Sequence, residues 1–317
     1  MKRASLVSVV LSLVAMVSAA GERFPFVLPW DDAKPSVIDL STWNERPAGK
    51  HGFVVAREDG HLYAGDQRIR FFGVNMCFGG NFPAKSAAPK IAARMAKFGI
   101  NCVRFHHLDM QTTPGGIFAK DGRTLDPEQL DRLDYFIAQL KERGIYTNLN
   151  LHVSRTHPDR PRSEKVGNSS YDKGVDNFSA GMIEAQHQYA QDLLGHVNPY
   201  TNTHYADEPA VAFVEINNEN ALLFEWMTGG LDKAAAPYRA ELSDLWTKWL
   251  RAKYGTDDGI AAAWKTGAKS QGTEILRNGA FTEGMGGWSF ETHEGAQAKS
   301  RLSDGPLEVV VEKAAQQ

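Results

Sequence analysis

The chain has 317 residues, of which 42% are hydrophobic and 23% charged, so its composition is that of a globular protein with a large core. Disordered and collagen-like chains are excluded. Lysine and arginine number 35 against 38 aspartate and glutamate residues, a formal net charge of −3, and no run of basic residues occurs. We therefore expect no nucleic acid partner.

Residues 1–20 have the pattern of a secretory signal peptide. Lys2 and Arg3 form a basic start, Ala4–Val17 is apolar, and small residues at 18–20 offer a cleavage site. The apolar stretch is shorter than the ~20 residues that span a bilayer, and serines interrupt it. We expect a secreted or periplasmic protein with no membrane span once the signal is removed.

The next expected element, within an N-terminal extension over residues 21–70, is a β-hairpin. Phe53–Arg57 turns through Glu58-Asp59-Gly60 into His61–Tyr63. After it the pattern alternates between strands and helices. Strands are predicted at 70–76, 100–105, 145–153 and 211–217, with helices at 87–98, from 127 to about 143, and at 182–194. This order predicts parallel strands joined by right-handed crossovers, and hence an α/β fold.

The second helix has the clearest boundaries. Asp126 is a capping residue, Pro127 occupies the first helical position, and Gln129 stands three residues after the cap. Gly144 ends the helix. An apolar stripe faces the core along it, consisting of Leu130, Leu133, Ile137 and Leu140.

The third strand favours a (β/α)8 TIM barrel over an open sheet. Thr147 and Leu149 alternate with Asn148, Asn150 and His152, so one face is mainly apolar and the other is polar. Helices would bury both faces of an open sheet, whereas a barrel directs the polar face to its interior, near the active-site mouth. No GxGxxG or GxxxxGK[ST] string opens a helix, and we expect no cofactor.

About the first four strands of this barrel fit in the sequence. We assign residues 71–272 to the first half of a barrel with a helical insertion, and the helices of that insertion are predicted at about 238–253 and 260–264. Residues 273–317 have the glycine-rich, aromatic texture of an incomplete β-sandwich, which includes a strand at 307–313.

The two cysteines are Cys77 and Cys102. Cys77 lies at the carboxyl end of the first barrel strand and Cys102 near the start of the second. In parallel neighbours these ends are several residues apart at ~3.3 Å each, beyond the ~7 Å limit for a bridge. We expect free thiols despite export.

The strongest local signal for chemistry is FVEINNENAL, which begins at Phe213. Strand alternation would place Glu215, Asn217 and Glu219 on one side, at the mouth of the barrel. A carboxylate preceded by the amide of Asn218 suits an acid catalyst beside a ligand for a substrate hydroxyl. The same string also fits a loop carboxylate that caps the following helix.

This motif resembles the fourth strand of clan A glycoside hydrolases, particularly the cellulase-like members of family 5. GVNMCFGGNF at Gly73, GINCVRFHHLD at Gly99 and NLNLHV at Asn148 resemble their first three strands. LWTKWLRAKYGTDDGIAAAW at Leu245 is similar to a helical insertion in several of these enzymes, and the tail from Ile275 resembles the start of a carbohydrate-binding module.

The resemblance implies retaining hydrolysis of O-glycosidic bonds in a poly- or oligosaccharide. Glu219 matches the acid/base and Asn218 the ligand of the sugar 2-hydroxyl. Arg104 matches the arginine that supports the nucleophile, and His152 a substrate-binding histidine. The nucleophile of these enzymes is a glutamate at the end of a seventh strand, and we find no such strand in this sequence. We therefore expect this chain to be the N-terminal part of such an enzyme and to be inactive by itself.

Other side chains are candidates on the residue pattern alone. His106 shares the inward side of its strand with Arg104, while His107 would face away unless the strand has ended. Arg104 equally suits an internal ion pair. Aromatic candidates for sugar stacking, each also suited to ordinary packing, are Trp226, Phe224 and Tyr171.

Two alternatives remain from the sequence. A non-catalytic glycan-binding protein with a degenerate barrel would account for the missing nucleophile. A metal-dependent hydrolase would use His106, His107, Asp109, His152 and His157, but adjacent strand histidines point apart and no HxH or HExxH spacing occurs. We therefore expect no metal.

Overall fold

The computed structural model describes residues 29–161, 173–266, 276–293, 295–302 and 307–314. The expected signal peptide and Tyr171 lie outside these residues. The chain divides into two compact units, residues 1–243 and 244–317.

The first unit contains a parallel sheet of four strands in chain order. Its strands are β4 (Gly73–Cys77), β5 (Cys102–His106), β6 (Tyr146–Asn150) and β9 (Val211–Glu215). The prediction of parallel strands in sequence order is confirmed. An α/β arrangement with this sheet fits part of a TIM barrel. The third and fourth strands end earlier than expected, at Asn150 and Glu215.

A second sheet precedes this one and consists of short antiparallel strands. It contains β1 (Val54–Ala56), β2 (Leu62–Ala64) and β3 (Gln67–Arg68). The predicted hairpin is confirmed, with Gly60 in the turn at a φ of 76°. A small pair, β7 (Val197–Asn198) and β8 (Thr203–His204), precedes β9.

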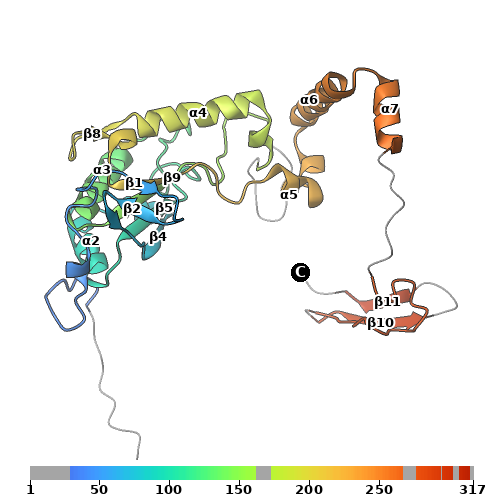
Figure 1. Ribbon diagram of the computed structural model, residues 1–317, viewed down its shortest axis with the longest axis horizontal. Coiled ribbons are helices and arrows are strands. Elements are labelled where there is room, and N and C mark those ends of the chain that lie inside the picture. Colours follow the sequence, from blue (N-terminus) through green and yellow to red (C-terminus); the bar gives the residue numbers. More distant parts are fainter. Residues whose placement is uncertain (1–28, 162–172, 267–275, 294, 303–306, 315–317) are drawn as a thin grey trace, which may run out of the picture. The chain divides into compact units, whose positions relative to one another are not determined.

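Three helices pack against the parallel sheet, as Figure 1 shows: α2 (Ala88–Lys97), α3 (Pro127–Glu142) and α4 (Ala180–Leu194). Between them lies the main core. Its fully buried members include Ala92, Val103, Phe105, Leu133, Phe136, Ile137, Leu140, Leu149 and Leu193. The expected stripe of α3 is confirmed, because Leu130 also packs against this core.

The start of α3 follows from its sequence. The side chain of Asp126 accepts hydrogen bonds from the backbone N–H groups of Glu128 and Gln129, both at 3.0 Å. Two of the donors that an α-helix leaves unpaired at its first turn are thereby satisfied. At the other end Gly144 has a φ of 73°, the left-handed conformation that glycine adopts without strain.

The other helices are short or lie toward the C-terminus. The 3₁₀ turns are Ser41–Trp43, Phe78–Asn81, Val175–Asn177, Tyr205–Asp207 and Leu231–Lys233. The α-helices are α5 (Leu222–Met227), α6 (Ala236–Tyr254) and α7 (Asp257–Thr266). The last two confirm the helices predicted at about 238–253 and 260–264, and both extend beyond the predicted ends. No helix in the described part of the chain is long and apolar enough to cross a bilayer.

The second unit ends in an antiparallel pair, β10 (Gln297–Leu302) and β11 (Leu307–Lys313). The strand predicted at 307–313 is therefore present. A β-sandwich needs two packed sheets, whereas the described residues of this unit contain one two-stranded sheet. The sandwich expected from the sequence is not confirmed.

Both cysteines are free thiols, as expected. The register pairs Gly73 with Cys102 and Cys77 with His106, so four residues of strand separate the cysteines along the sheet. At ~3.3 Å per residue they are too far apart to be joined. We expect two thiol equivalents when the protein is denatured without reductant and titrated with a thiol reagent. One equivalent or none would contradict the strand register.

Candidate active site

One face of the parallel sheet is polar, as the alternation of polar and apolar residues in the third strand predicted. The register aligns Asn75, Arg104 and Asn148 across β4, β5 and β6. Val103 and Phe105 alternate with Arg104 and pack into the helix-covered core. All four strands end at the same edge, where Asn150 pairs with Glu215. The FVEINNENAL motif leaves the sheet at this edge.

Arg104 organises the polar face near that edge. Its Nε lies 2.6 Å from Glu215 Oε2 and its Nη2 lies 2.5 Å from Oε1, a bidentate ion pair whose side chains are about one quarter exposed. The same Nη2 donates to Asn218 Oδ1 at 2.9 Å. The hydrogen bonds from Arg104 lower the pKa of Glu215, and the pairing raises the pKa of Arg104. The internal ion pair that the sequence left open is therefore present, with Glu215 as partner.

Glu219 follows in a turn rather than in the strand. The ladder ends at Glu215, and Glu219 has a φ of 48°, in the left-handed region. Strand alternation consequently does not extend to Glu219, which corrects the expected common side for Glu215, Asn217 and Glu219. The Glu219 residue is exposed and its backbone oxygen accepts from Lys173 Nζ at 3.2 Å. A carboxylic acid in this position is open to a bound substrate.

His152 lies at the same edge but is buried, with an exposed fraction of 6%. Its Nδ1 lies 2.9 Å from Asp109 Oδ2, and its Nε2 forms a very short hydrogen bond with Asp176 Oδ2. Burial alone would lower the pKa of His152, but the two carboxylates together raise it to about 9. Both ring nitrogens are occupied, so the expected contact between His152 and a substrate has no free ring atom in this arrangement.

The histidine pair on the second strand also differs from expectation. His106 is buried, and its Nδ1 lies 2.7 Å from Asn150 Oδ1. The strand ends at His106, and His107 has a φ of 61°, so the two rings lie together with centroids 3.7 Å apart. The expectation that adjacent histidines point apart is wrong, because the turn replaces strand alternation. His107 stacks on Phe78 with a centroid distance of 4.3 Å.

The aromatic candidates after the motif are on the surface. Trp226 and Phe224 belong to α5, with exposed fractions of 67% and 59%. Both rings are therefore available for stacking. Within the described residues, no group of three side chains is arranged to hold a metal ion.

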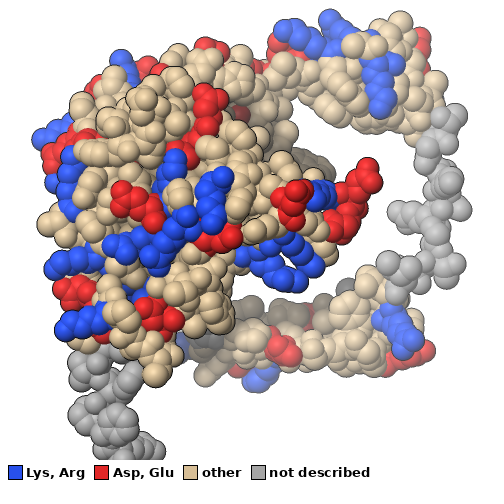
Figure 2. Space-filling view, turned by 60° about the vertical axis from the view of Figure 1, so that its left-hand side comes forward, with Lys and Arg blue, Asp and Glu red and all other residues tan. Residues whose placement is uncertain are grey.

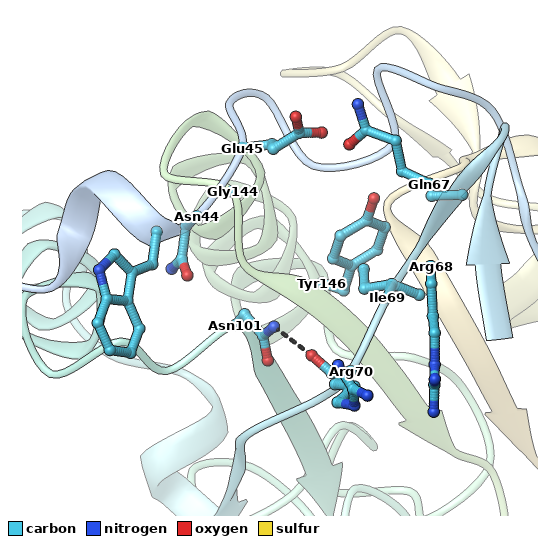
Figure 3. A pocket seen from close by; sticks show the side chains of 11 residues that line it. Asn44, Glu45, Gln67, Arg68, Ile69, Arg70, Asn101, Gly144 and Tyr146 are labelled. Carbon is cyan, nitrogen blue, oxygen red and sulfur yellow. Dashed lines mark hydrogen bonds between the residues drawn. The ribbon is translucent and has the colours of Figure 1, made fainter. Parts of the chain in front are cut away.

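A separate hollow of about 240 Å³ lies at the opposite edge of the sheet (Figure 3). Asn101 and Tyr146, at the starts of β5 and β6, line it together with Arg68 and Arg70. Asn101 Nδ2 donates to the backbone oxygen of Arg70 at 2.7 Å, the dashed line in Figure 3. The one carboxylate in the lining, Glu45, is 2.7 Å from His51 Nε2. This hollow contains no pair of carboxylates.

The sequence did not indicate a role for two residues near Glu219, Asp176 and Asn220. Asp176 is 5% exposed and joins His152 to Asn220, whose Nδ2 donates to Asp176 Oδ2 at 2.7 Å. Asp176 lies in a long loop with no periodic pattern, so no spacing signal marked it. The available signal was chemical, because an inward-facing histidine after a buried strand needs a buried acceptor.

Comparison with known proteins gives the family. Solved structures with similarity include an endo-1,4-β-mannanase from Rhizomucor miehei (18% identity, 53% of this chain and 48% of the other, TM-score 0.42). A family 5 mannosidase from the same organism (16%, 56% and 52%, 0.43) and an endo-1,4-β-D-mannanase from Thermotoga petrophila (21%, 52% and 52%, 0.37) also match.

The chain spans about half the length of these matched structures. A search of curated protein sequences gave no match. The model of the cellulase family, glycosyl hydrolase family 5, matches residues 62–241, which is more than half of the chain and includes every strand of the parallel sheet. The chain therefore belongs to glycosyl hydrolase family 5.

Proposed function

We propose that this chain is part of an exported glycoside hydrolase that cleaves O-glycosidic bonds of a poly- or oligosaccharide with retention of configuration. In this proposal Glu219 is the acid/base, Asn218 binds the sugar 2-hydroxyl, and Arg104 holds the amide of Asn218 in place. Membership of family 5 supports the class of reaction.

The observation that carries the assignment is the contact of Arg104 with both Glu215 and Asn218. It fixes the amide immediately before Glu219 at the carboxyl edge of the sheet, where barrel enzymes bind their substrates. Because Arg104 donates to Asn218 Oδ1, the Asn218 amide nitrogen remains the atom to donate to a sugar oxygen.

A retaining mechanism needs a second carboxylate about 5 Å from the acid. Glu215 is the other carboxylate on the motif, and both of its oxygens already accept from Arg104. We therefore propose that the nucleophile comes from outside the four described strands, at the end of a later strand as the family resemblance implies. Glu215, kept ionised by Arg104, is the next carboxylate to test.

The surface is compatible with a neutral sugar chain as substrate. On the face that Figure 2 shows, Lys and Arg side chains are interspersed with Asp and Glu. This mixture favours no polyanionic ligand there. Export rests on the signal-like residues 1–20, and a carbohydrate-binding module after residue 273 is supported by the β10–β11 pair.

The test uses the complete enzyme of which this chain is proposed to be a part. It is hydrolysis of a panel of neutral β-linked oligosaccharides, including cello- and manno-oligosaccharides, followed by proton NMR of the first-formed sugar anomer. Release of the same anomer as in the substrate supports retaining hydrolysis. Release of the opposite anomer overturns the mechanism. Binding of the oligosaccharides without any cleavage would favour the glycan-binding alternative.

A further inference from the structure

A hydrogen-bonded network of four polar side chains, three of them buried, reaches the residue that follows Glu219. Asp109, His152 and Asp176 are each at most 6% exposed, and Asn220 completes the network. Asp109 Oδ2 accepts from His152 Nδ1 (2.9 Å), and Asp176 Oδ2 accepts both from His152 Nε2 and from Asn220 Nδ2 (2.7 Å). The four residues come from four separate segments of sequence.

Hydrogen bonds connect the segments of this network to the turn on both sides of Glu219. Before the glutamate, the backbone N–H of Asn218 donates to the backbone oxygen of His152 at 2.9 Å. After it, Asn220 Oδ1 accepts from the backbone N–H of Gly174 at 2.7 Å and from Asn177 Nδ2 at 3.1 Å. Asn218 is therefore held by the backbone of His152, and Asn220 is held by Asp176, the partner of the His152 side chain. Glu219 lies between these two residues in the sequence.

The backbone of Glu219 needs such support. A non-glycine residue at a φ of 48° is in a sparsely populated region, and such conformations persist where the surroundings fix them. Asp109 is itself anchored, because its carboxylate accepts from the backbone N–H of Val153 at 3.1 and 3.2 Å. The turn is thus tied through His152 to the buried end of the sheet.

We propose that His152, Asp176 and Asn220 are positioning residues that hold Glu219 at the angle needed for proton transfer, and that His152 does not contact the substrate. This inference rests on the proposed acid/base role of Glu219. For His152 to bind a sugar hydroxyl, one of its ring nitrogens would have to leave a buried carboxylate. Leaving a buried charge unpaired is strongly unfavourable.

Two variants test the inference, with a matched control. Asn220→Ala removes the half-buried amide that donates to Asp176. Asp176→Ala removes the central carboxylate, which joins His152 to Asn220. The control is Asp134→Ala, because Asp134 is also a buried aspartate that pairs with a histidine, His196 at 2.7 Å, and accepts from a second side chain. Asp134 lies on α3, outside the turn.

Amide hydrogen exchange reports the position of the turn without any substrate. In Asn220→Ala and Asp176→Ala we expect the peptide over residues 216–221 to exchange at least about tenfold faster relative to the core peptide 88–97 on α2, which contains none of the replaced residues. In Asp134→Ala we expect no such selective change. Unchanged exchange in 216–221, or acceleration equal to that of the core, would overturn the positioning role.

Hydrolysis separates positioning from stability. A misplaced acid should lower kcat/KM more for an oligosaccharide, whose leaving group needs a proton, than for a dinitrophenyl glycoside, which needs little protonation. We expect this split, about tenfold or more, in Asn220→Ala and Asp176→Ala, and equal losses in Asp134→Ala. Equal losses in all three variants would overturn the inference. These kinetics are measured on the complete enzyme of which this chain is proposed to be a part, because the nucleophile is proposed to lie outside the four described strands. No hydrolysis by that wild-type enzyme would instead reject the proposed function and leave the exchange result standing.

Discussion

In the complete enzyme of which this chain is proposed to be a part, replacing Glu219 by Gln is expected to reduce hydrolysis of oligosaccharides by about 10²–10⁴-fold, the usual contribution of a general acid. Glutamine keeps the size and shape of the side chain but has no proton to give to the leaving oxygen. Activated aryl glycosides need little protonation, so their first step should be much less affected. Steady-state and burst kinetics on both substrate types measure the difference.

The same replacement tests the second step. Water loses its base in Glu219→Gln, so the glycosyl intermediate should accumulate with the activated substrate. Added azide needs no base and should restore turnover, giving a glycosyl azide of retained configuration. Glu142→Gln, an exposed carboxylate on α3, is the control and should behave as wild type. Equal losses on both substrates without azide rescue would remove Glu219 from this role and make Glu215 the next candidate.

Local signals in the sequence predicted the fold well where a residue type has a specific structural role, such as capping a helix. Asp126, Pro127 and Gly144 marked the two ends of α3 because capping and a left-handed glycine are local properties. The polar alternation of the third strand correctly placed Asn148 and Asn150 on the face that carries Arg104. The resemblance to family 5 then indicated the position of Asn218 and Glu219.

The contacts within the site were less predictable because they depend on where strands end. The sequence left open whether the second strand ends before His107, and it predicted strand alternation as far as Glu219. Both residues have positive φ values, 61° and 48°, and lie beyond the strand ends. One turn brings the His106 and His107 rings together, and the other separates Glu219 from the strand. The partners of His152 lie 43 and 24 residues away, so no spacing in the sequence connects them.

The buried position of His152 gives the protein a pH-dependent stability. Its pKa, about 6.5 in an unfolded chain, is raised to about 9 by Asp109 and Asp176 against the effect of burial. At 1.36 kcal/mol per pKa unit this corresponds to about 3 kcal/mol of stabilisation. Since the folded pKa is the higher one, the contribution is fully present below pH 6.5 and is lost as the pH rises through 9.

We therefore expect the free energy of unfolding in urea to fall by about 3 kcal/mol from this histidine between pH 6 and 9.5. Burial lowers the pKa of His157 to about 4 and raises that of Cys102 to about 11 in the folded protein, so these two groups titrate in this range only in the unfolded chain. Their contribution to the pH slope is common to wild type and to a variant that changes only the partners of His152. The double replacement Asp109→Asn and Asp176→Asn keeps the side-chain shapes but removes both charges, and this fall in the free energy of unfolding should largely disappear.

NMR titration of the His152 ring, assigned by its loss in His152→Gln, measures the pKa directly. A midpoint at or below 6.5, or the same pH slope in the double variant as in wild type, would show that the imidazole is not held between two ionised carboxylates.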